Sequence, residues 1–200
     1  LSVKHLLMAS TSSVYGANQQ MPFIENEKAD TQLTLYAATK KANESMAHAY
    51  SNLWSLPITM FRFFTVYGPW GRPDLALYKF VSAMLDGKAI DIYNNGNMYR
   101  DFTYIDDLVE AITLLVDAVP DQSEKSKFAG DSLSPVAPFR VVNIGNAEKI
   151  KLLDFIGAIE DALNIKAKRN YMPMQMGDVP ATWANTELLH KLTGFSPATN

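Results

Sequence analysis

Cysteine is absent from the 200-residue sequence, and histidine occurs only 3 times. Without cysteine there can be no disulfide bonds, no thiolate zinc site and no cysteine nucleophile, although the redox state of the compartment stays open. The histidines lie far apart along the chain and lack the spacing of metal ligands, so we interpret them as structural or surface residues. The sequence therefore predicts no metal site.

Long apolar runs and clusters of basic residues are also lacking. No run approaches the ~20 apolar residues that span a bilayer, and no signal peptide is visible, so we expect a cytoplasmic protein that does not act at a membrane. The net charge is −3, and the densest basic stretch, Lys166–Arg169, is short. Because a phosphate-binding face needs clustered Lys and Arg, nucleic acid is not an expected partner.

What is present is an alternation of strand-like and helix-like segments. Residues 4–10 and 58–64 are continuous apolar runs, typical of strands buried on both faces of a parallel sheet. Asp106 is the expected N-cap of one helix, and residues 120–138 read as an exposed loop. In all, helices are expected over 34–54, 75–85, 106–119, 152–163 and 186–192, with short strands over 89–93, 102–105, 140–144 and 168–171. This pattern predicts an α/β fold with a mostly parallel sheet.

The helix expected from residue 34 carries Tyr36 and Lys40 one turn apart, so the two side chains share a face. A nearby ammonium favours the phenolate form of a tyrosine, and a cationic nicotinamide ring would add to this effect. Such a base can take the proton of a sugar hydroxyl while hydride leaves the same carbon. Unrelated surface pairs also meet this spacing, so neighbouring residues must decide.

Four consecutive hydroxyl side chains, Ser10–Ser13, follow the first expected strand. Ligands of parallel α/β sheets gather beyond the carboxyl ends of the strands, where residues 10–13 and 65–72 both fall. Thr11 can hydrogen-bond the reacting hydroxyl and share its proton with Tyr36. The sequence therefore predicts Thr11, Tyr36 and Lys40 as the catalytic residues.

Motifs along nearly the whole chain resemble the extended short-chain dehydrogenase/reductase family. They stand in that family's order: S-T-x-x-V-Y-G from Ser10, Y-x-x-x-K from Tyr36, R-F-F-T-V-Y-G-P from Arg62, Y-R-D-F-T-Y-I-D-D from Tyr99, R-V-V-N-I-G-N from Arg140 and M-G-D-V-P-A-T-W-A from Met176. Within the family, A-S-T-S-S-V-Y-G, Y-A-A-T-K-K-A-N-E and F-R-F-F-T-V-Y-G-P-W-G-R-P-D are similar to the UDP-glucuronate 4-epimerases. Each motif is weak alone, but their succession is specific.

The resemblance implies a fold, a cofactor and an assembly. The chain would form the C-terminal part of a Rossmann-type doubly wound parallel sheet plus a smaller α/β substrate-binding domain. Residues 1–70 would be the second half of an NAD-binding domain, and residues 71–200 mainly the nucleotide-sugar region, with 100–119 and 140–146 returning to the Rossmann core. NAD would be the cofactor, a UDP-sugar the substrate and polysaccharide biosynthesis the setting. The intact protein would be a homodimer, pairing partly through the helix of Tyr36.

The resemblance also implies roles for single residues. Thr11 and Tyr36 would act on the sugar 4-hydroxyl, and Lys40 would orient the nicotinamide ribose. Ser10 and Phe63 would be further cofactor contacts. Arg100 would bind the diphosphate, a task that suits the guanidinium fork; the alternative is a surface residue that pairs with Asp101 or Asp106. The remaining nucleotide contacts would be Tyr93 near the uracil, with Gln175 and Asp178 near the UDP ribose.

Ser12 and Ser13 help to choose the reaction. Dehydratases of this family carry a carboxylate just after the threonine, and this chain has none there. The reaction that remains is oxidation at C4, rotation of the 4-keto sugar and return of hydride to its other face. Alternatives left open are 4-epimerisation of a neutral or pentose UDP-sugar and a catalytically idle dehydrogenase-like binding protein.

A uronic acid substrate would form a β-keto acid, so the site must hold its carboxylate away from the ketone π-system. Ser12, Ser13 and Thr65 can donate hydroxyls to that carboxylate, and Arg72 can supply a cation. Thr65 is informative because galactose-specific epimerases usually carry Asn there. The favoured substrate is therefore UDP-glucuronate, with UDP-galacturonate as the product.

A Gly-rich phosphate turn with an acidic residue about 20 positions later is missing from these residues. The sequence also opens directly on a strand pattern. We therefore expect a fragment that lacks the N-terminal Gly-rich half, that binds NAD poorly and that is inactive alone.

Overall fold

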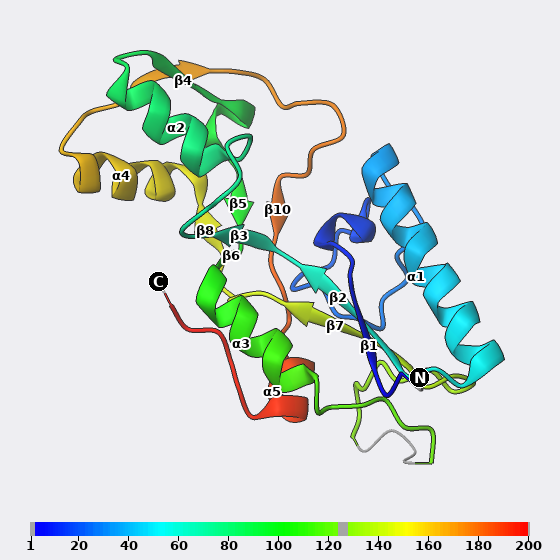
Figure 1. Cartoon of the computed structure of the whole chain (residues 1–200). Coiled ribbons are helices and arrows are strands. Elements are labelled where there is room, and N and C mark those ends of the chain that lie inside the picture. The colour runs from blue at the N-terminus through cyan, green and yellow to red at the C-terminus, as the bar shows by residue number, and fades with distance from the viewer. Residues whose placement is uncertain (1–2, 124–127, 200) are drawn as a thin grey trace.

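The computed structural model describes residues 3–123 and 128–199. Its centre is a parallel three-stranded sheet in the order β1-β2-β7, formed by Leu6–Ala9, Ile58–Phe63 and Phe139–Ile144 (Figure 1). Helix α1, Leu35–Trp54, packs against one face of this sheet, while α3, Ile105–Leu115, and α5, Glu187–Thr193, cover the other. The predicted parallel α/β fold is confirmed.

Alternating side chains of β2 and β7 fill a core on each face of the sheet. Met60 and Val141 point toward the α1 side, whereas Phe61 and Val142 pack with Leu108 and its neighbours on the other side. All but the last residue of β2 and every residue of β7 are buried. Two-sided burial explains why these strands read as continuous apolar runs rather than as alternating patterns.

The expectation that residues 4–10 form a strand buried on both faces is wrong for β1. Leu6 and Ala9 are exposed, and Leu7 and Met8 are only half-buried. Within the described residues β1 pairs with β2 alone, so its outer edge remains open. An apolar run identifies a strand, but it does not say how many neighbours cover that strand.

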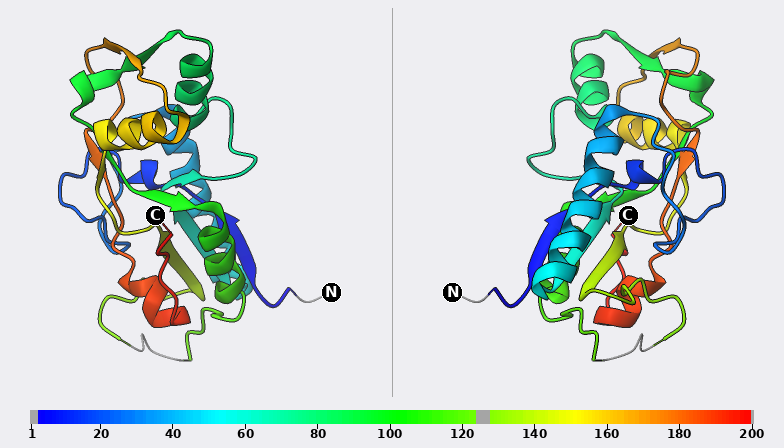
Figure 2. Two further views of the ribbon diagram at one scale, coloured as in Figure 1. Left: turned by 90° about the vertical axis from the view of Figure 1, so that its left-hand side faces the viewer. Right: turned by 90° about the vertical axis from the view of Figure 1, so that its right-hand side faces the viewer.

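A second lobe lies beyond the carboxyl end of β2 (Figures 1 and 2). Its core joins apolar side chains of Phe80, Met84, Ile90, Ile92 and Ile156. The elements of this lobe are α2 (Ala76–Leu85), β4 (Ala89–Ile92), η2 (Tyr93–Gly96), α4 (Leu152–Leu163) and β9 (Lys168–Tyr171), with β4 and β9 parallel. The division of the chain at residue 70 stays a prediction.

Short strands connect the two lobes. One pair is β3, Thr65–Tyr67, with β6, Phe102–Tyr104. A three-stranded group has β5, Tyr99–Arg100, between β10, Ala181–Thr182, and β8, Ile150–Lys151. These strands bring residues that are far apart in the sequence to one place between the lobes.

Asp106 is not the N-cap of α3, contrary to the sequence prediction. The helix begins at Ile105, its N-cap is Tyr104, and Asp106 lies inside the first turn. Strand β6 runs straight into α3 without a loop, so no capping residue separates the two elements. The helix also ends at Leu115, earlier than expected, and Pro120 follows soon after. None of the described helices is both long and apolar enough to traverse a bilayer.

Gly16, which ends the first motif, is required by its backbone. Its φ is +54°, and a Cβ there would lie 2.0 Å from the carbonyl oxygen of Thr31. Gly87 also has a positive φ, of +66°, but a Cβ there would meet nothing within 4 Å. We expect Gly16→Ala to lower the free energy of unfolding by about 3 kcal/mol and Gly87→Ala by only about 1 kcal/mol, measured by urea denaturation. An equal decrease in the free energy of unfolding for both variants would mean that the loop at Thr31 moves to make room for the added Cβ.

Candidate active site

The carboxyl end of β1 turns directly into the short helix η1, Ser12–Tyr15. The Ser10 N–H continues the sheet by donating to the Phe61 carbonyl at 2.7 Å. Thr11 caps η1: its Oγ1 accepts the Ser13 N–H at 3.2 Å and lies 3.3 Å from the Ser13 hydroxyl. One tight turn therefore gathers the hydroxyl groups of residues 11–13 at the end of a strand.

Helix α1 begins beside this turn and carries Tyr36 and Lys40. Thr34 caps the helix by accepting the Ala37 N–H at 3.1 Å. Tyr36 lies in the first turn with 55% of its surface exposed, and the Lys40 ammonium donates to the Ala9 carbonyl at 3.1 Å. Since α1 also contacts η1, the segments that carry the three predicted catalytic residues lie together at the carboxyl end of β1.

A cavity of about 160 Å³ opens next to this turn. Its lining residues include three with hydroxyl side chains, Ser12, Ser13 and Thr65, and two with charged side chains, Arg100 and Asp178. Its other lining residues are Gly16, Phe23, Leu33, Thr34, Gly177, Val179 and Thr182. Five residues predicted from the sequence to bind substrate thus line one cavity, which we call the hydroxyl cavity.

A second cavity, of about 290 Å³, lies in the other lobe and is mainly apolar. Tyr93 and Phe80 are among its lining residues, and Thr65, Arg100 and Asp178 line it as well as the hydroxyl cavity. The two cavities are therefore neighbours that meet at these three residues. We call this second cavity the apolar cavity.

Arg100 and Asp178 form an ion pair at the junction of the cavities. The Arg100 Nη2 donates to Asp178 Oδ1 at 2.7 Å, and its Nη1 donates to the Tyr99 carbonyl at 2.8 Å. Burial lowers the pKa of Arg100 and the Asp178 carboxylate opposes that change, yet a guanidinium remains charged under such a shift. Neither Asp101 nor Asp106, the partners considered from the sequence, is the carboxylate that pairs with it.

Asp101 has a structural function that sequence reasoning missed. Its buried carboxylate accepts N–H groups from Asn146 at 2.7 Å and from Ala147 and Ala184, each at 3.0 Å. Burial raises the pKa of Asp101, whereas these hydrogen bonds work against that rise. Asp101 thus ties the ends of β7 and β10 to the strands beside the cavities. No local motif signals partners so distant in sequence.

Tyr15, within the V-Y-G motif, is also structural. Its hydroxyl donates to Asn143 at 2.8 Å, and its ring stacks on Phe23 with centroids 4.4 Å apart. The Arg62 guanidinium lies 4.6 Å from the centre of the Tyr15 ring. Burial raises the pKa of Tyr15 to about 12, so this phenol stays protonated at neutral pH and anchors η1.

Seven residues predicted for the site line neither cavity. Four of them, Ser10, Thr11, Tyr36 and Lys40, belong to the end of β1 and to α1 described above; the other three lie on other segments. Arg72 lies on an exposed loop and pairs with Asp74, although Tyr36 is close enough to interact with it electrostatically. Gln175 is exposed, and its backbone carbonyl accepts the Asp178 N–H. Phe63 packs beside the core under α3 and α5. Their contacts with ligands stay predictions.

A parallel sheet whose Tyr–Lys helix begins at the carboxyl ends of the strands is typical of one class of protein, the Rossmann-type dehydrogenases. The model of the NAD dependent epimerase/dehydratase family matches residues 1–129, and the chain belongs to this family. The resemblance drawn from the motifs is confirmed.

Relatives and solved structures narrow the comparison. A probable UDP-glucuronate 4-epimerase of Rhizobium meliloti is 54% identical over 99% of the chain and 59% of the relative. Protein CapI of Staphylococcus aureus is 53% identical over 99% of the chain and 60% of the relative. The UDP-glucuronic acid 4-epimerase of Bacillus cereus, solved with UDP-glucuronic acid and NAD, has a TM-score of 0.84 at 30% identity, covering 100% of this chain and 58% of that one. The chain therefore spans about 60% of the length of these relatives.

Proposed function

We propose that this chain carries the proton-transfer and nucleotide-sugar-binding residues of an NAD-dependent enzyme that converts UDP-glucuronate to UDP-galacturonate. One observation carries the proposal: the hydroxyl cavity joins Ser12, Ser13 and Thr65 with the Arg100–Asp178 pair. The relatives named UDP-glucuronate 4-epimerase support the same substrate. Action in the cytoplasm stays a prediction.

The residues present fit the nicotinamide–ribose part of NAD. Tyr36 and Lys40 offer a hydroxyl and an ammonium beside the open edge of β1, donors that suit ribose hydroxyls. When bound, NAD supplies the hydride acceptor and donor for C4. Lys40 would orient that ribose, whereas the Ser10 hydroxyl is already used by Glu44 inside the protein.

Tyr36 would take and return the proton of the sugar 4-hydroxyl, with Thr11 hydrogen-bonded to the same oxygen. Ser12, Ser13 and Thr65 would donate to the uronate carboxylate. They would keep its bond to the ring out of alignment with the ketone π-system, because that alignment favours loss of carbon dioxide. Arg100 would bind the diphosphate between the cavities, and the apolar cavity with Tyr93 would take the uracil. No carboxylate follows Thr11 to act on C5.

Homodimerisation of the intact protein also stays a prediction, supported by α1. This helix exposes large apolar side chains along its length, from Leu35 to Met46, Tyr50, Leu53 and Trp54. Monomeric proteins rarely expose so much apolar surface on one element.

The direct test is turnover by a polypeptide of the relatives' length that contains this sequence. With UDP-glucuronate and NAD we expect UDP-galacturonate, identified by proton NMR of the purified product. UDP-glucose should react at least about 100-fold more slowly, because the hydroxyl cavity is built to pair with a charged group. Faster turnover of a neutral UDP-sugar would make that sugar the substrate in place of UDP-glucuronate. Binding of UDP without any turnover would favour an idle binding protein.

A further inference from the structure

Glu44 is a buried carboxylate on the catalytic helix, one turn beyond Lys40. Its side chain is 4% exposed. Oε1 accepts the Ser10 hydroxyl at 2.7 Å and Arg62 Nε at 2.9 Å, while Oε2 accepts Arg62 Nη2 at 2.8 Å. Burial acts to raise the pKa of Glu44, but Arg62, Ser10 and Lys41 together outweigh it and the net pKa is lowered. Glu44 is thus held as an anion in the interior, where its charge does not serve solubility.

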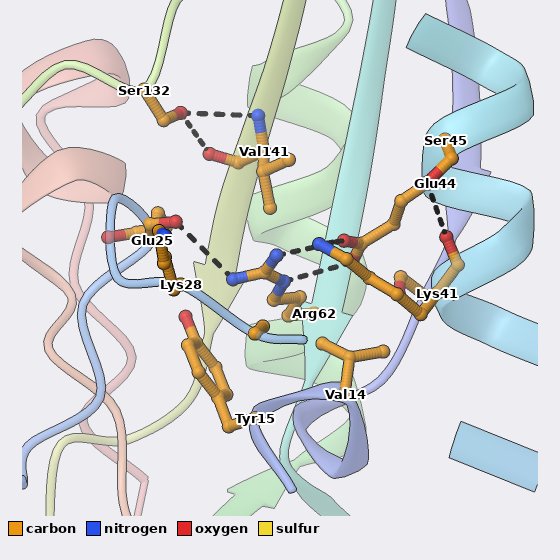
Figure 3. Close-up of polar contacts among 12 residues, drawn as sticks. Val14, Tyr15, Glu25, Lys28, Lys41, Glu44, Ser45, Arg62, Ser132 and Val141 are labelled. Atoms are coloured by element: carbon orange, nitrogen blue, oxygen red, sulfur yellow. Dashed lines mark hydrogen bonds and ion pairs between the residues drawn. The ribbon is translucent and has the colours of Figure 1, made fainter. Parts of the chain in front are cut away.

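Arg62 connects this carboxylate to the turn that carries the hydroxyl groups. It lies on β2, forms the two-pronged bond with Glu44, and covers the ring of Tyr15 in η1 (Figure 3). Its Nη1 lies 3.4 Å from the Glu25 carbonyl, in the loop that leads toward α1. A planar guanidinium fork fixes direction as well as distance, which a lysine ammonium does not.

Two neighbouring residues at the end of β1 therefore form hydrogen bonds with successive turns of α1. Lys40 holds the Ala9 carbonyl, and Glu44 holds the Ser10 hydroxyl. The next residue along the strand is Thr11, and the previous turn of the helix carries Tyr36. The contacts of Ser10 and Lys40 fix how far α1 can slide or rotate relative to the strand end.

We propose that Glu44 and Arg62 are positioning residues that set the register of Tyr36 against Thr11, with the Ser10 hydroxyl as the contact that transmits it. This inference rests on the proposed function, since the register matters for proton transfer at one sugar oxygen. Displacement of a reacting group by about 1 Å can cost about 100-fold in rate, so loss of one of these hydrogen bonds is expected to be visible.

Ser10→Ala in the full-length polypeptide tests this with little disturbance. At saturating NAD we expect kcat to fall about tenfold, while the KM for UDP-glucuronate and the Kd for UDP stay within about twofold. The matched control is Ser51→Ala on α1: Ser51 is also buried, but among the described residues its hydroxyl has no hydrogen-bond partner. Ser51→Ala should leave kcat unchanged.

A second readout does not depend on turnover. In protein labelled with 3-fluorotyrosine, the Tyr36 resonance can be assigned by its loss in Tyr36→Phe. Ser10→Ala and Arg62→Lys should shift or broaden that resonance, whereas Ser51→Ala should not. An unchanged Tyr36 resonance in Ser10→Ala overturns the positioning role, even if the parent protein proves inactive on UDP-glucuronate. If the parent is inactive on UDP-glucuronate but Ser10→Ala shifts the Tyr36 resonance, only the proposed reaction is overturned.

Discussion

Replacing Tyr36 by phenylalanine is expected to lower kcat for UDP-glucuronate about 1000-fold in the full-length polypeptide. The change removes a single oxygen, the one that would take the proton as hydride leaves C4. More than half of the Tyr36 surface is exposed, and no described hydrogen bond from its hydroxyl supports the fold, so stability should hardly change. Because Tyr36 lines neither of the two cavities, the Kd for UDP measured by calorimetry should remain that of the parent.

Tyr50→Phe is the matched control for this prediction. Tyr50 lies on the same helix with nearly the same exposure, 56% against 55%, but far from η1. It should keep the full kcat. If Tyr36→Phe kept more than about a tenth of the parent's kcat, the proton would have to be held by another group, and Thr11 would be the first to examine.

Local patterns sufficed for much of this fold. Helix α4 and strand β9 begin and end where the sequence predicts, because apolar periodicity and the residues at their ends are both local. The gathering of Ser12, Ser13 and Thr65 also followed from sequence, since the carboxyl ends of parallel strands share one edge of a sheet. The comparison with known families then agreed with the order of the motifs.

What escaped prediction depends on contacts between distant segments. The partner of Arg100 is Asp178, far along the chain, rather than its neighbour Asp101. The motif R-F-F-T-V-Y-G-P gave no sign that its Arg62 forms a buried pair with Glu44. The openness of β1 likewise reflects which strands are its neighbours and not its own composition. Such pairings are set by how the lobes and layers meet, and a single sequence records them only indirectly.

Arg100→Met should weaken UDP binding about 100-fold while leaving uridine binding unchanged. The guanidinium lies where the hydroxyl and apolar cavities meet, so it can reach a diphosphate whose base occupies the apolar cavity. Hydrogen bonds to charged groups contribute about 1.5–3 kcal/mol each, which corresponds to a loss of that order. Calorimetry with UDP and uridine measures both affinities. Arg169→Met, at an arginine paired with Glu160 away from both cavities, is the control.

The unpaired Asp178 in this variant offers a competing explanation, because its carboxylate would repel a diphosphate once Arg100 is gone. The double variant Arg100→Met/Asp178→Asn removes that repulsion without restoring the cation. If Arg100 binds the diphosphate, UDP affinity stays low in the double variant. Recovery to the parent's affinity would mean that Arg100 only neutralises Asp178, and the diphosphate would then need another cation. Because uridine carries no phosphate, its binding should be unaffected in both cases, which separates loss of charge recognition from damage to the apolar cavity.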